Sequence, residues 1–264
     1  MNVKLVALTK SFINEKELSP EDLIVYIARV SNPNNQLNIE TSDRLLNYLI
    51  KNKHWSPLEH VSFTVEIKTS RAIAAQILRH RSFVFQEFSQ RYSEISNFED
   101  VQLRYQADKN RQSSTDLVQD ASLNQDIKNL LAHSQKLYSK LISQGVAKEC
   151  ARMILPLTTE TTIYMTGSVR SWLHYLELRC DEHTQLEHRD IANAIKNDIF
   201  VKNFPNISKA LGWNLEAMRS GKAGFVKDVI EHLFNLDKTI VKDGKTLEVN
   251  NPREVLHKQI SLKH

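Results

Sequence analysis

The chain has 264 residues, with 35 Lys or Arg, 31 Asp or Glu and a formal net charge of +4. Hydrophobic residues make up 41% and charged residues 25%, which is typical of a globular protein and excludes a disordered chain. Its two cysteines exclude a disulfide framework and a four-cysteine zinc site. No segment has the roughly 20 consecutive apolar residues of a membrane helix, and the first residues do not form a secretory signal. We therefore expect a cytoplasmic protein with reduced cysteines and no membrane partner.

The first third of the chain predicts two strands and three helices. Ser19 followed by Pro20 and two acids is a helix start, because Ser caps the free N–H groups and Pro fits the first turn. Apolar and polar residues alternate over 61–68, which predicts a half-buried strand. In chain order, we expect a strand at 3–8, a helix from 20 that ends before Asn32, a helix from 41 or 42, a strand at 61–68 and a helix capped by Ser70 that reaches Arg81.

The middle of the chain predicts a loop, a further strand and several helices. Residues 97–115 are rich in Gln, Asn and Ser, and we expect a long loop there. Gly145 stands where a helix C-cap would, and Pro156 stops a short helix. Beyond the loop, we expect helices at 122–143 and 146–155, a strand at 158–166, and helices at 169–180 and 184–203.

The last part of the chain differs from the rest in charge. Residues 219–264 hold nine Lys or Arg and six Asp or Glu, a balance of +3, so the preceding residues carry only +1 of the total of +4. We therefore expect a catalytic body over residues 1–218 and a basic, helical C-terminal appendage over residues 219–264.

The densest group of charged side chains follows the third predicted helix. Arg79, His80, Arg81 and Arg91 are opposed there by a single carboxylate, Glu87. An arginine guanidinium presents paired N–H donors that match phosphate oxygens, so this group predicts a phosphate or nucleotide-anion site. Two other interpretations stay open on these residues alone: a solvated basic helix end, or a basic and aromatic surface for nucleic acid. The near balance of charge over the body argues against a nucleic-acid partner.

The spacing within this group is more specific than its charge. Arg-His-Arg, seven residues and then Ser-x-Arg, as in RHRSFVFQEFSQR, resembles the diagnostic motif of flavin-dependent thymidylate synthases. Three further segments resemble that family in the same order: HWSPLEH at 54–60, ECARMILP at 149–156, and SVRS with LRCDEH within 168–183. The resemblance covers about residues 1–215 and leaves the appendage without a counterpart.

This resemblance implies a fold, a reaction and an assembly. The fold would be α+β and specific to the family, a single domain with a central antiparallel sheet and long flanking helices. The activity would be methylation of dUMP to dTMP, with carbon from methylenetetrahydrofolate and a hydride from FADH2 that NADPH regenerates. The enzyme would be a homotetramer with active sites shared between subunits. A Rossmann domain is excluded separately, because the sequence has no Gly-x-Gly-x-x-Gly motif.

The resemblance also assigns residues to the two ligands. For dUMP it implies Gln76, Arg79, Glu87, Ser89, Gln90, Arg91, Arg152 and Arg179. For FAD it implies Ser56, Glu59, Arg79, His80, Arg81, Glu87, Ser168, Arg170, His174 and His183. Catalytic roles would fall to Glu87, to His54 and to Arg179, whose fixed charge would stabilise negative charge on the uracil ring. Gln90 stands where many relatives have Gly, and Ser168 and His174 where some have Asn.

Neither cysteine nor metal chemistry is expected. Cys150 is predicted to lie in the core, and Cys180 could be activated in principle by neighbouring Arg179, but the resemblance gives it no role. The ten histidines lack the HExxH or CxxC spacing of metal sites, so no metal is predicted.

Overall fold

A computed structural model describes residues 1–13, 17–94 and 97–213, and the backbone of 239–242 and 245–248. The chain divides into two units, residues 1–213 and 214–264. In the second unit the described residues form an antiparallel pair, β7 (Thr239–Lys242) and β8 (Lys245–Glu248). The helices predicted for the appendage lie outside the described residues. No described helix is long and apolar enough to cross a lipid bilayer.

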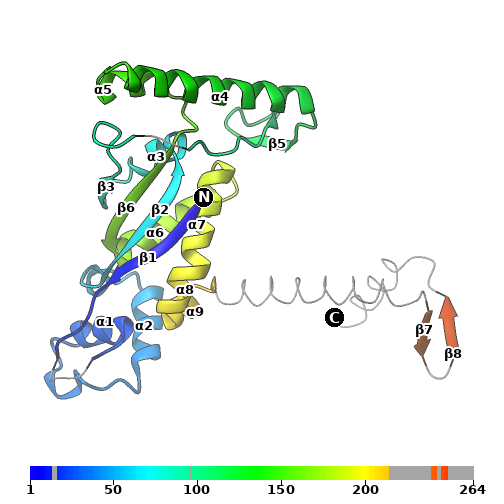
Figure 1. Ribbon diagram of the computed structural model, residues 1–264. Helices are drawn as coiled ribbons and strands as arrows, with labels where there is room; N and C mark the ends of the chain where they lie inside the picture. Colours follow the sequence, from blue (N-terminus) through cyan, green and yellow to red (C-terminus); the bar gives the residue numbers. More distant parts are fainter. Residues whose placement is uncertain (14–16, 95–96, 214–238, 243–244, 249–264) are drawn as a thin grey trace. The chain divides into compact units, whose positions relative to one another are not determined.

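A four-stranded antiparallel sheet organises the first unit (Figure 1). In spatial order its strands are β1 (Asn2–Leu8), β2 (Ser62–Ser70), β6 (Glu160–Ser168) and β3 (Val84–Glu87). The central strands β2 and β6 pair without a break, from Ser62 opposite Ser168 to Ser70 opposite Glu160. The predicted α+β fold with a central antiparallel sheet is therefore confirmed, and it differs from the parallel sheet of a Rossmann domain.

One face of the sheet carries the main core, because apolar residues alternate along the central strands. The buried side chains on this face are Phe63, Val65, Ile67, Ile163 and Met165. Three helices pack over them: α3 (Arg71–Ile77), α6 (Val169–Arg179) and α7 (Leu186–Ala194). Trp172 of α6 stacks on Phe63 with ring centroids 4.6 Å apart, and its Nε1 donates to the Phe63 carbonyl oxygen at 3.2 Å. This contact fixes α6 against β2.

Shorter helices pack together where β2 begins. They are α1 (Pro20–Ala28), η1 (Pro33–Asn35), α2 (Ser42–Lys51), η2 (Ser56–Glu59) and α9 (Pro205–Ala210). The start of α1 is as predicted, since the Asp22 N–H donates to Ser19 Oγ at 3.1 Å and Pro20 occupies the first turn. Buried Glu21 joins α1 to α9 by accepting a hydrogen bond from the Ile207 N–H at 2.8 Å.

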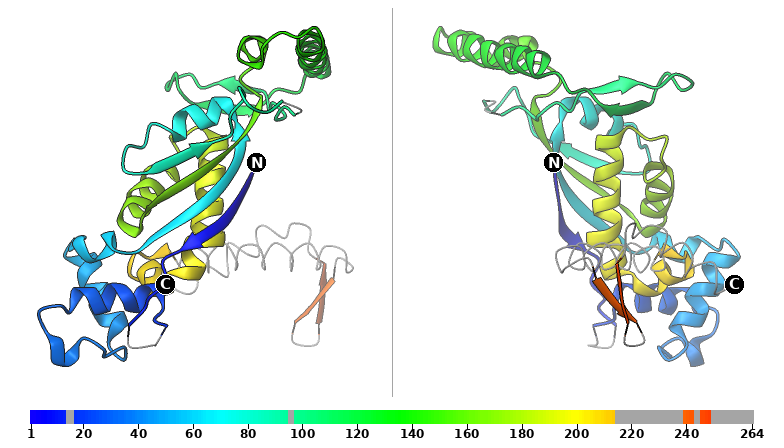
Figure 2. Two further views of the ribbon diagram at one scale, coloured as in Figure 1. Left: turned by 60° about the vertical axis from the view of Figure 1, so that its left-hand side comes forward. Right: turned by 90° about the vertical axis from the view of Figure 1, so that its right-hand side faces the viewer.

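A long helix, α4 (Ala121–Ser143), extends away from the sheet (Figure 2). Asp120 caps it by accepting hydrogen bonds from the Ser122 and Leu123 N–H groups at 2.8 and 3.1 Å. Of its 23 residues only Ser134 and Tyr138 are buried, against α5 (Lys148–Ala151) and η3 (Arg152–Ile154). Most of the surface of α4 is therefore exposed in a single copy of the chain.

The predicted loop at 97–115 is wrong in part, because it contains a hairpin. Strands β4 (Arg104–Gln106) and β5 (Ser114–Leu117) pair there. Arg104 anchors this hairpin: its Nε donates to Ser114 Oγ at 2.9 Å, and its Nη2 lies 2.5 Å from Oε1 of Glu187 on α7. The anchor depends on a residue far along the chain, so the local composition did not indicate it.

Three predicted helices have different limits in the structure. The third ends at Ile77 instead of Arg81, and a turn carries residues 79–81. The helix at 146–155 is split into α5 and η3, because the residue before Pro156 is extended and the last turn tightens. The helix predicted at 184–203 is not a single α-helix. It consists of α7, the π-helix η4 (Ile195–Phe200) and α8 (Val201–Asn203) in succession.

Candidate functional site

A cavity of about 580 Å³ opens where the end of α3 meets the C-terminal end of α6. Three of the predicted dUMP residues line it: Gln76 from α3, Arg79 from the turn that follows, and Arg179 from α6. His183, a predicted flavin residue, lines it as well. Gln112, between β4 and β5, contributes to the wall, so the unpredicted hairpin borders this cavity.

A hydrogen bond joins the Arg-His-Arg motif to the last residue of α6. Arg179 Nε donates to His80 Nε2 at 2.9 Å. Burial, and then the positive charges of Arg179 and His174, lower the pKa of His80 to about 4, so the imidazole is neutral at pH 7 and can accept. Within the part of the chain that the structure describes, no carboxylate forms an ion pair with Arg179. Its charge is thus held in place beside the cavity and is available to an anionic ligand.

The side-chain amide of Gln76 lies between two polar neighbours. Its Nε2 donates to Gln185 Oε1 at 2.6 Å, and its Oε1 lies 3.3 Å from His188 Nδ1. His188 is fully buried, and its Nε2 lies 3.1 Å from the Tyr175 hydroxyl. Burial, and then the charges of Arg179 and His80, lower the pKa of His188 to about 3. A neutral, buried imidazole is therefore the hydrogen-bond partner of the Gln76 carbonyl oxygen.

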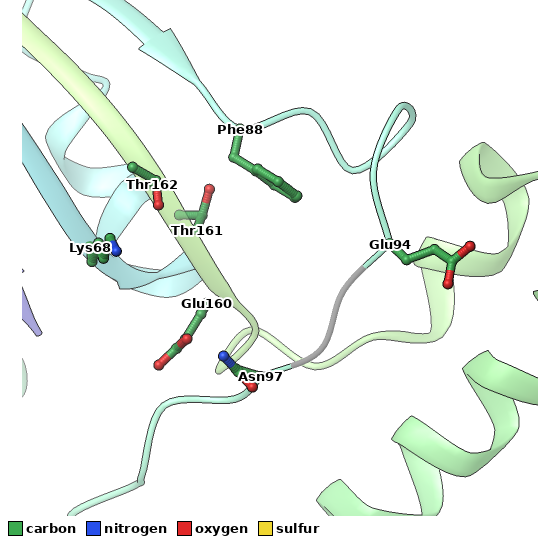
Figure 3. Close-up of a pocket in the computed structure, with 7 residues that line it drawn as sticks. All are labelled: Lys68, Phe88, Glu94, Asn97, Glu160, Thr161 and Thr162. Atoms are coloured by element: carbon green, nitrogen blue, oxygen red, sulfur yellow. The ribbon is translucent and has the colours of Figure 1, made fainter.

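Glu87, at the end of β3, is held away from this cavity. It forms an ion pair with Arg71 at the start of α3, and the Thr161 hydroxyl donates to its Oε1 at 2.9 Å. Thr161 also lines a neighbouring cavity of about 220 Å³, in which Figure 3 shows the Phe88 ring beside it. None of the predicted site residues lines that neighbouring cavity.

Ser89 and Arg91 line a separate, open depression next to α5. Arg91 forms an ion pair with Glu149 at 3.2 Å, and more than half of each side chain is exposed. Gln90, which stands between them, has a buried side-chain Nε2 with no hydrogen-bond partner among the described residues. Arg152 follows α5 and opens η3. The guanidinium of Arg91 and the hydroxyl of Ser89 are hydrogen-bond donors at this depression, and such donors suit a phosphate group.

A third group of predicted residues lies at the N-terminus of α6. The Ser168 hydroxyl donates to Glu59 Oε2 at 2.6 Å, and Arg170 Nη1 donates to Glu59 Oε1 at 2.7 Å. The bond from Ser168 is the main reason that the pKa of Glu59 lies below its ordinary value. Ser56 begins η2, which Glu59 ends. His54 is exposed just before η2, and its ring packs edge-on against Tyr48 with centroids 5.5 Å apart.

Comparisons with known proteins identify the family. A family model described as "Thymidylate synthase complementing protein" matches residues 13–206. A probable flavin-dependent thymidylate synthase of Paramecium bursaria Chlorella virus 1 is 52% identical over 217 residues, which cover 81% of this chain and 100% of that protein. A flavin-dependent thymidylate synthase of Synechocystis sp. is 50% identical over 218 residues, with 81% and 100% covered. The chain belongs to the flavin-dependent thymidylate synthase family.

One solved structure extends this assignment to the fold. The UMP/dUMP methylase PolB of Streptomyces cacaoi, crystallised with 5-Br dUMP, is 25% identical and matches with a TM-score of 0.65. The match covers 79% of this chain and 93% of that protein. The chain is therefore an enzyme with the α+β fold that the resemblance implied.

In this flavin-dependent thymidylate synthase, the residues assigned to one ligand fall into separate groups within a single copy. Of the dUMP residues, Gln76, Arg79 and Arg179 share the cavity, whereas Ser89, Gln90, Arg91 and Arg152 lie by α5 and Glu87 lies on β3. Of the FAD residues, Ser56, Glu59, Ser168 and Arg170 lie together, whereas His80 and His183 belong to the cavity region. Arg81 and His174 are exposed.

Among the residues near the site that were not predicted, Arg71, Gln185 and His188 form side-chain interactions with predicted residues. Arg71 and Gln185 contact predicted residues only after folding, so nothing in their own segments indicates a role. His188 does carry a sequence signal, because it shares a helix face with Ile191, Ala192 and Ile195, all buried. A histidine on such an apolar face is buried with a specific partner. Cys150, which we predicted to be buried, is exposed instead.

The buried imidazole makes the fold sensitive to acid. An ordinary histidine has a pKa near 6.5, and His188 in the folded chain has a pKa of about 3, so the unfolded state binds more protons between these values. The stability that neutral His188 provides is complete above pH 6.5 and is lost as the pH falls toward 3. We expect His188 to contribute up to about 1.4 kcal/mol per pH unit to the fall in unfolding free energy over this window.

Chemical denaturation at a series of pH values measures this slope. The variant His188→Gln should show a shallower slope than the wild-type chain. His133→Gln, the same change at an exposed position of α4, is the control and should leave the slope unchanged. Equal slopes for His188→Gln and the wild type would contradict the assignment.

Proposed function

We propose that this chain methylates dUMP to dTMP in de novo thymidylate synthesis, with methylenetetrahydrofolate as carbon donor and FADH2, regenerated by NADPH, as hydride donor. The observation that carries the proposal is the Arg179 side chain, held by neutral His80 at a cavity that Gln76 and Arg79 also line. The flavin-dependent thymidylate synthases that are 50% or more identical to the chain support it. The cytoplasm is the expected location of this reaction.

In this proposal, one group of residues binds the phosphate of the nucleotide and another binds its nucleoside part. Arg91, with Ser89, binds the phosphate, and Arg152 adds a second guanidinium. Gln90 lies between Ser89 and Arg91 and is assigned to the nucleotide with them, although many relatives have Gly there. Gln76, Arg79 and Arg179 bind the nucleoside part.

The chemistry at the uracil ring depends on charge. Arg179 lies against the ring, where its fixed cation favours the enolate-like form of the uracil by stabilising the negative charge of that form. His80 keeps Arg179 in position and, being neutral, does not compete for the anion. Arg71 and Thr161 hold Glu87, which in this proposal lies near both ligands and orders a water or an arginine. His54 is the remaining candidate near the reacting centre.

The donor set along α6 fits FAD. Arg170 and His174 are four residues apart and share one helix face, and Arg81 and His80 lie on the Arg-His-Arg turn, so guanidinium and imidazole groups are available to the phosphates of the cofactor. Ser56, Glu59 and Ser168 offer hydroxyl and carboxylate oxygens, and His183 and Arg79 lie toward the nucleotide. When bound, FAD would supply the hydride that reduces the transferred carbon.

We also propose a homotetramer whose active sites are shared between subunits. Residues assigned to one nucleotide lie in separate places on one copy, so a second copy is needed to bring a complete set together. The long helix α4 offers a surface for this contact. Leu123, Leu130 and Leu137, seven residues apart along one face, are 47%, 64% and 38% exposed, which is the spacing of a helix–helix seam.

Replacement of the phosphate residue tests the ligand assignment. The variant Arg91→Ala should bind dUMP at least about tenfold more weakly, since a hydrogen bond to a charged group contributes ~1.5–3 kcal/mol. Its flavin absorbance, and the bleaching of that absorbance by NADPH, should match the wild type. Titration calorimetry with dUMP and visible spectra measure the two properties.

The control for this experiment is Arg44→Ala, which removes the same charge from an exposed position of α2 and should change neither property. Equal loss of dUMP and flavin in Arg91→Ala would contradict the separate roles. A wild-type protein that binds neither dUMP nor flavin would overturn the proposed function.

A charge on the exposed stripe of α4 tests the assembly. Leu130→Glu places a carboxylate in the proposed seam and should convert the tetramer into smaller species, seen by sedimentation equilibrium, with loss of dUMP binding. Gln125→Glu, the same charge change on the opposite side of α4, should leave the tetramer intact. A Leu130→Glu monomer that binds dUMP with wild-type affinity would exclude shared sites.

A further inference from the structure

A network of side-chain hydrogen bonds connects a carboxylate, Glu187, to the amide of Gln76. Arg104 of β4 donates to Glu187 Oε1 at 2.5 Å, and Gln185 Nε2 donates to Glu187 Oε2 at 2.9 Å. Burial alone would raise the pKa of Glu187, but the bonds from Arg104 and Gln185 help to lower it below the ordinary value. Glu187 is therefore ionised and can only accept hydrogen bonds.

This carboxylate determines which atom donates and which accepts in the next hydrogen bonds of the network. Because Glu187 only accepts, Gln185 must turn its NH2 group toward Glu187 and its Oε1 toward Gln76. Gln76 must then present its own NH2 group to Gln185, at 2.6 Å. The carbonyl oxygen of Gln76 is left facing His188 Nδ1, at 3.3 Å.

The hydrogen bonds at the buried end of the network, at His188 and Tyr175, are consistent with this direction. Nδ1 of His188 carries the proton that Gln76 Oε1 accepts, so Nε2 of the neutral ring is an acceptor. Burial raises the pKa of Tyr175, which keeps its proton and donates it to His188 Nε2 at 3.1 Å. No bond in this network has two donors or two acceptors facing each other, and an inverted Gln76 amide would place its oxygen against the oxygen of Gln185.

The amide of Gln76 is thereby locked with one N–H unused. Its NH2 group has two hydrogens and Gln185 takes one of them, whereas its oxygen is occupied by His188. Gln76 lines the cavity, so the second N–H is available to a ligand there. The cavity thus presents a donor at this point and no competing amide oxygen.

We propose that Glu187, Gln185 and His188 are positioning residues for nucleotide binding: they hold the Gln76 amide so that its free N–H donates to an acceptor oxygen of dUMP. The proposal rests on the function proposed above, because it takes the ligand of this cavity to be dUMP. It also gives the β4–β5 hairpin a role, since Arg104 secures the carboxylate from which the chain of bonds starts.

Gln185 is the best residue at which to test this, because its side chain is exposed and its loss does not open the core. Titration calorimetry on the flavin-loaded, full-length enzyme would measure the dissociation constant for dUMP. Gln76→Ala and Gln185→Ala should each raise it about three- to tenfold, the range expected for one lost hydrogen bond between neutral groups. The double variant should bind no more weakly than the weaker single variant, because Gln185 acts only through Gln76.

Gln125→Ala is the matched control. It removes an exposed glutamine whose Nε2 donates to Asn129 Oδ1 at 2.9 Å on α4, and the dissociation constant should not change. Thermal unfolding of each variant would confirm that all are folded.

Two results would overturn the positioning role while the proposed function stands: wild-type affinity in Gln185→Ala, or effects of Gln76→Ala and Gln185→Ala that multiply in the double variant. A wild-type enzyme that does not bind dUMP would instead overturn the proposed function, and this inference with it.

Discussion

The pairing of β2 with β6 is the constraint on which the site depends. Both strands have nine residues, and each continues directly into a helix, β2 into α3 at Arg71 and β6 into α6 at Val169. Since the strands are antiparallel, the two helices start at opposite ends of the sheet and run toward each other over the same face. Nine residues of strand span about 30 Å, whereas α3 with seven residues and α6 with eleven span about 10 and 16 Å. The C-terminal ends of the helices therefore meet over the sheet.

That meeting point explains where the charges are. A helix C-terminus favours cations, and here two such ends bring Arg79, His80 and Arg179 into one region. Repulsion between them is avoided because burial keeps His80 neutral, so that it accepts a hydrogen bond from Arg179. The result is a positive charge fixed by the fold, next to a cavity, which is what stabilisation of a developing anion requires.

The sequence predicted the elements whose signals are local. Ser19 and Pro20 start α1 as expected, and the alternation around Phe63 and Val65 predicted β2. The resemblance assigned eight residues to dUMP, and three of them, Gln76, Arg79 and Arg179, line one cavity in the structure. Contacts between distant segments could not be predicted in this way. The hairpin at Arg104 depends on Glu187, and the direction of the Gln76 amide depends on a carboxylate two residues from Gln185.

The central claim is that the cavity holds dUMP for methylation, with the carbon supplied by methylenetetrahydrofolate and the hydride by a reduced flavin. Release of tritium from dUMP labelled at carbon 5 of the ring measures that reaction directly, because the methyl group replaces this hydrogen. In the presence of methylenetetrahydrofolate, NADPH and FAD, tritium should appear in water in step with dTMP, and omission of the folate should abolish dTMP formation. A flavin-loaded enzyme that binds dUMP but forms no dTMP in the complete mixture would contradict the account.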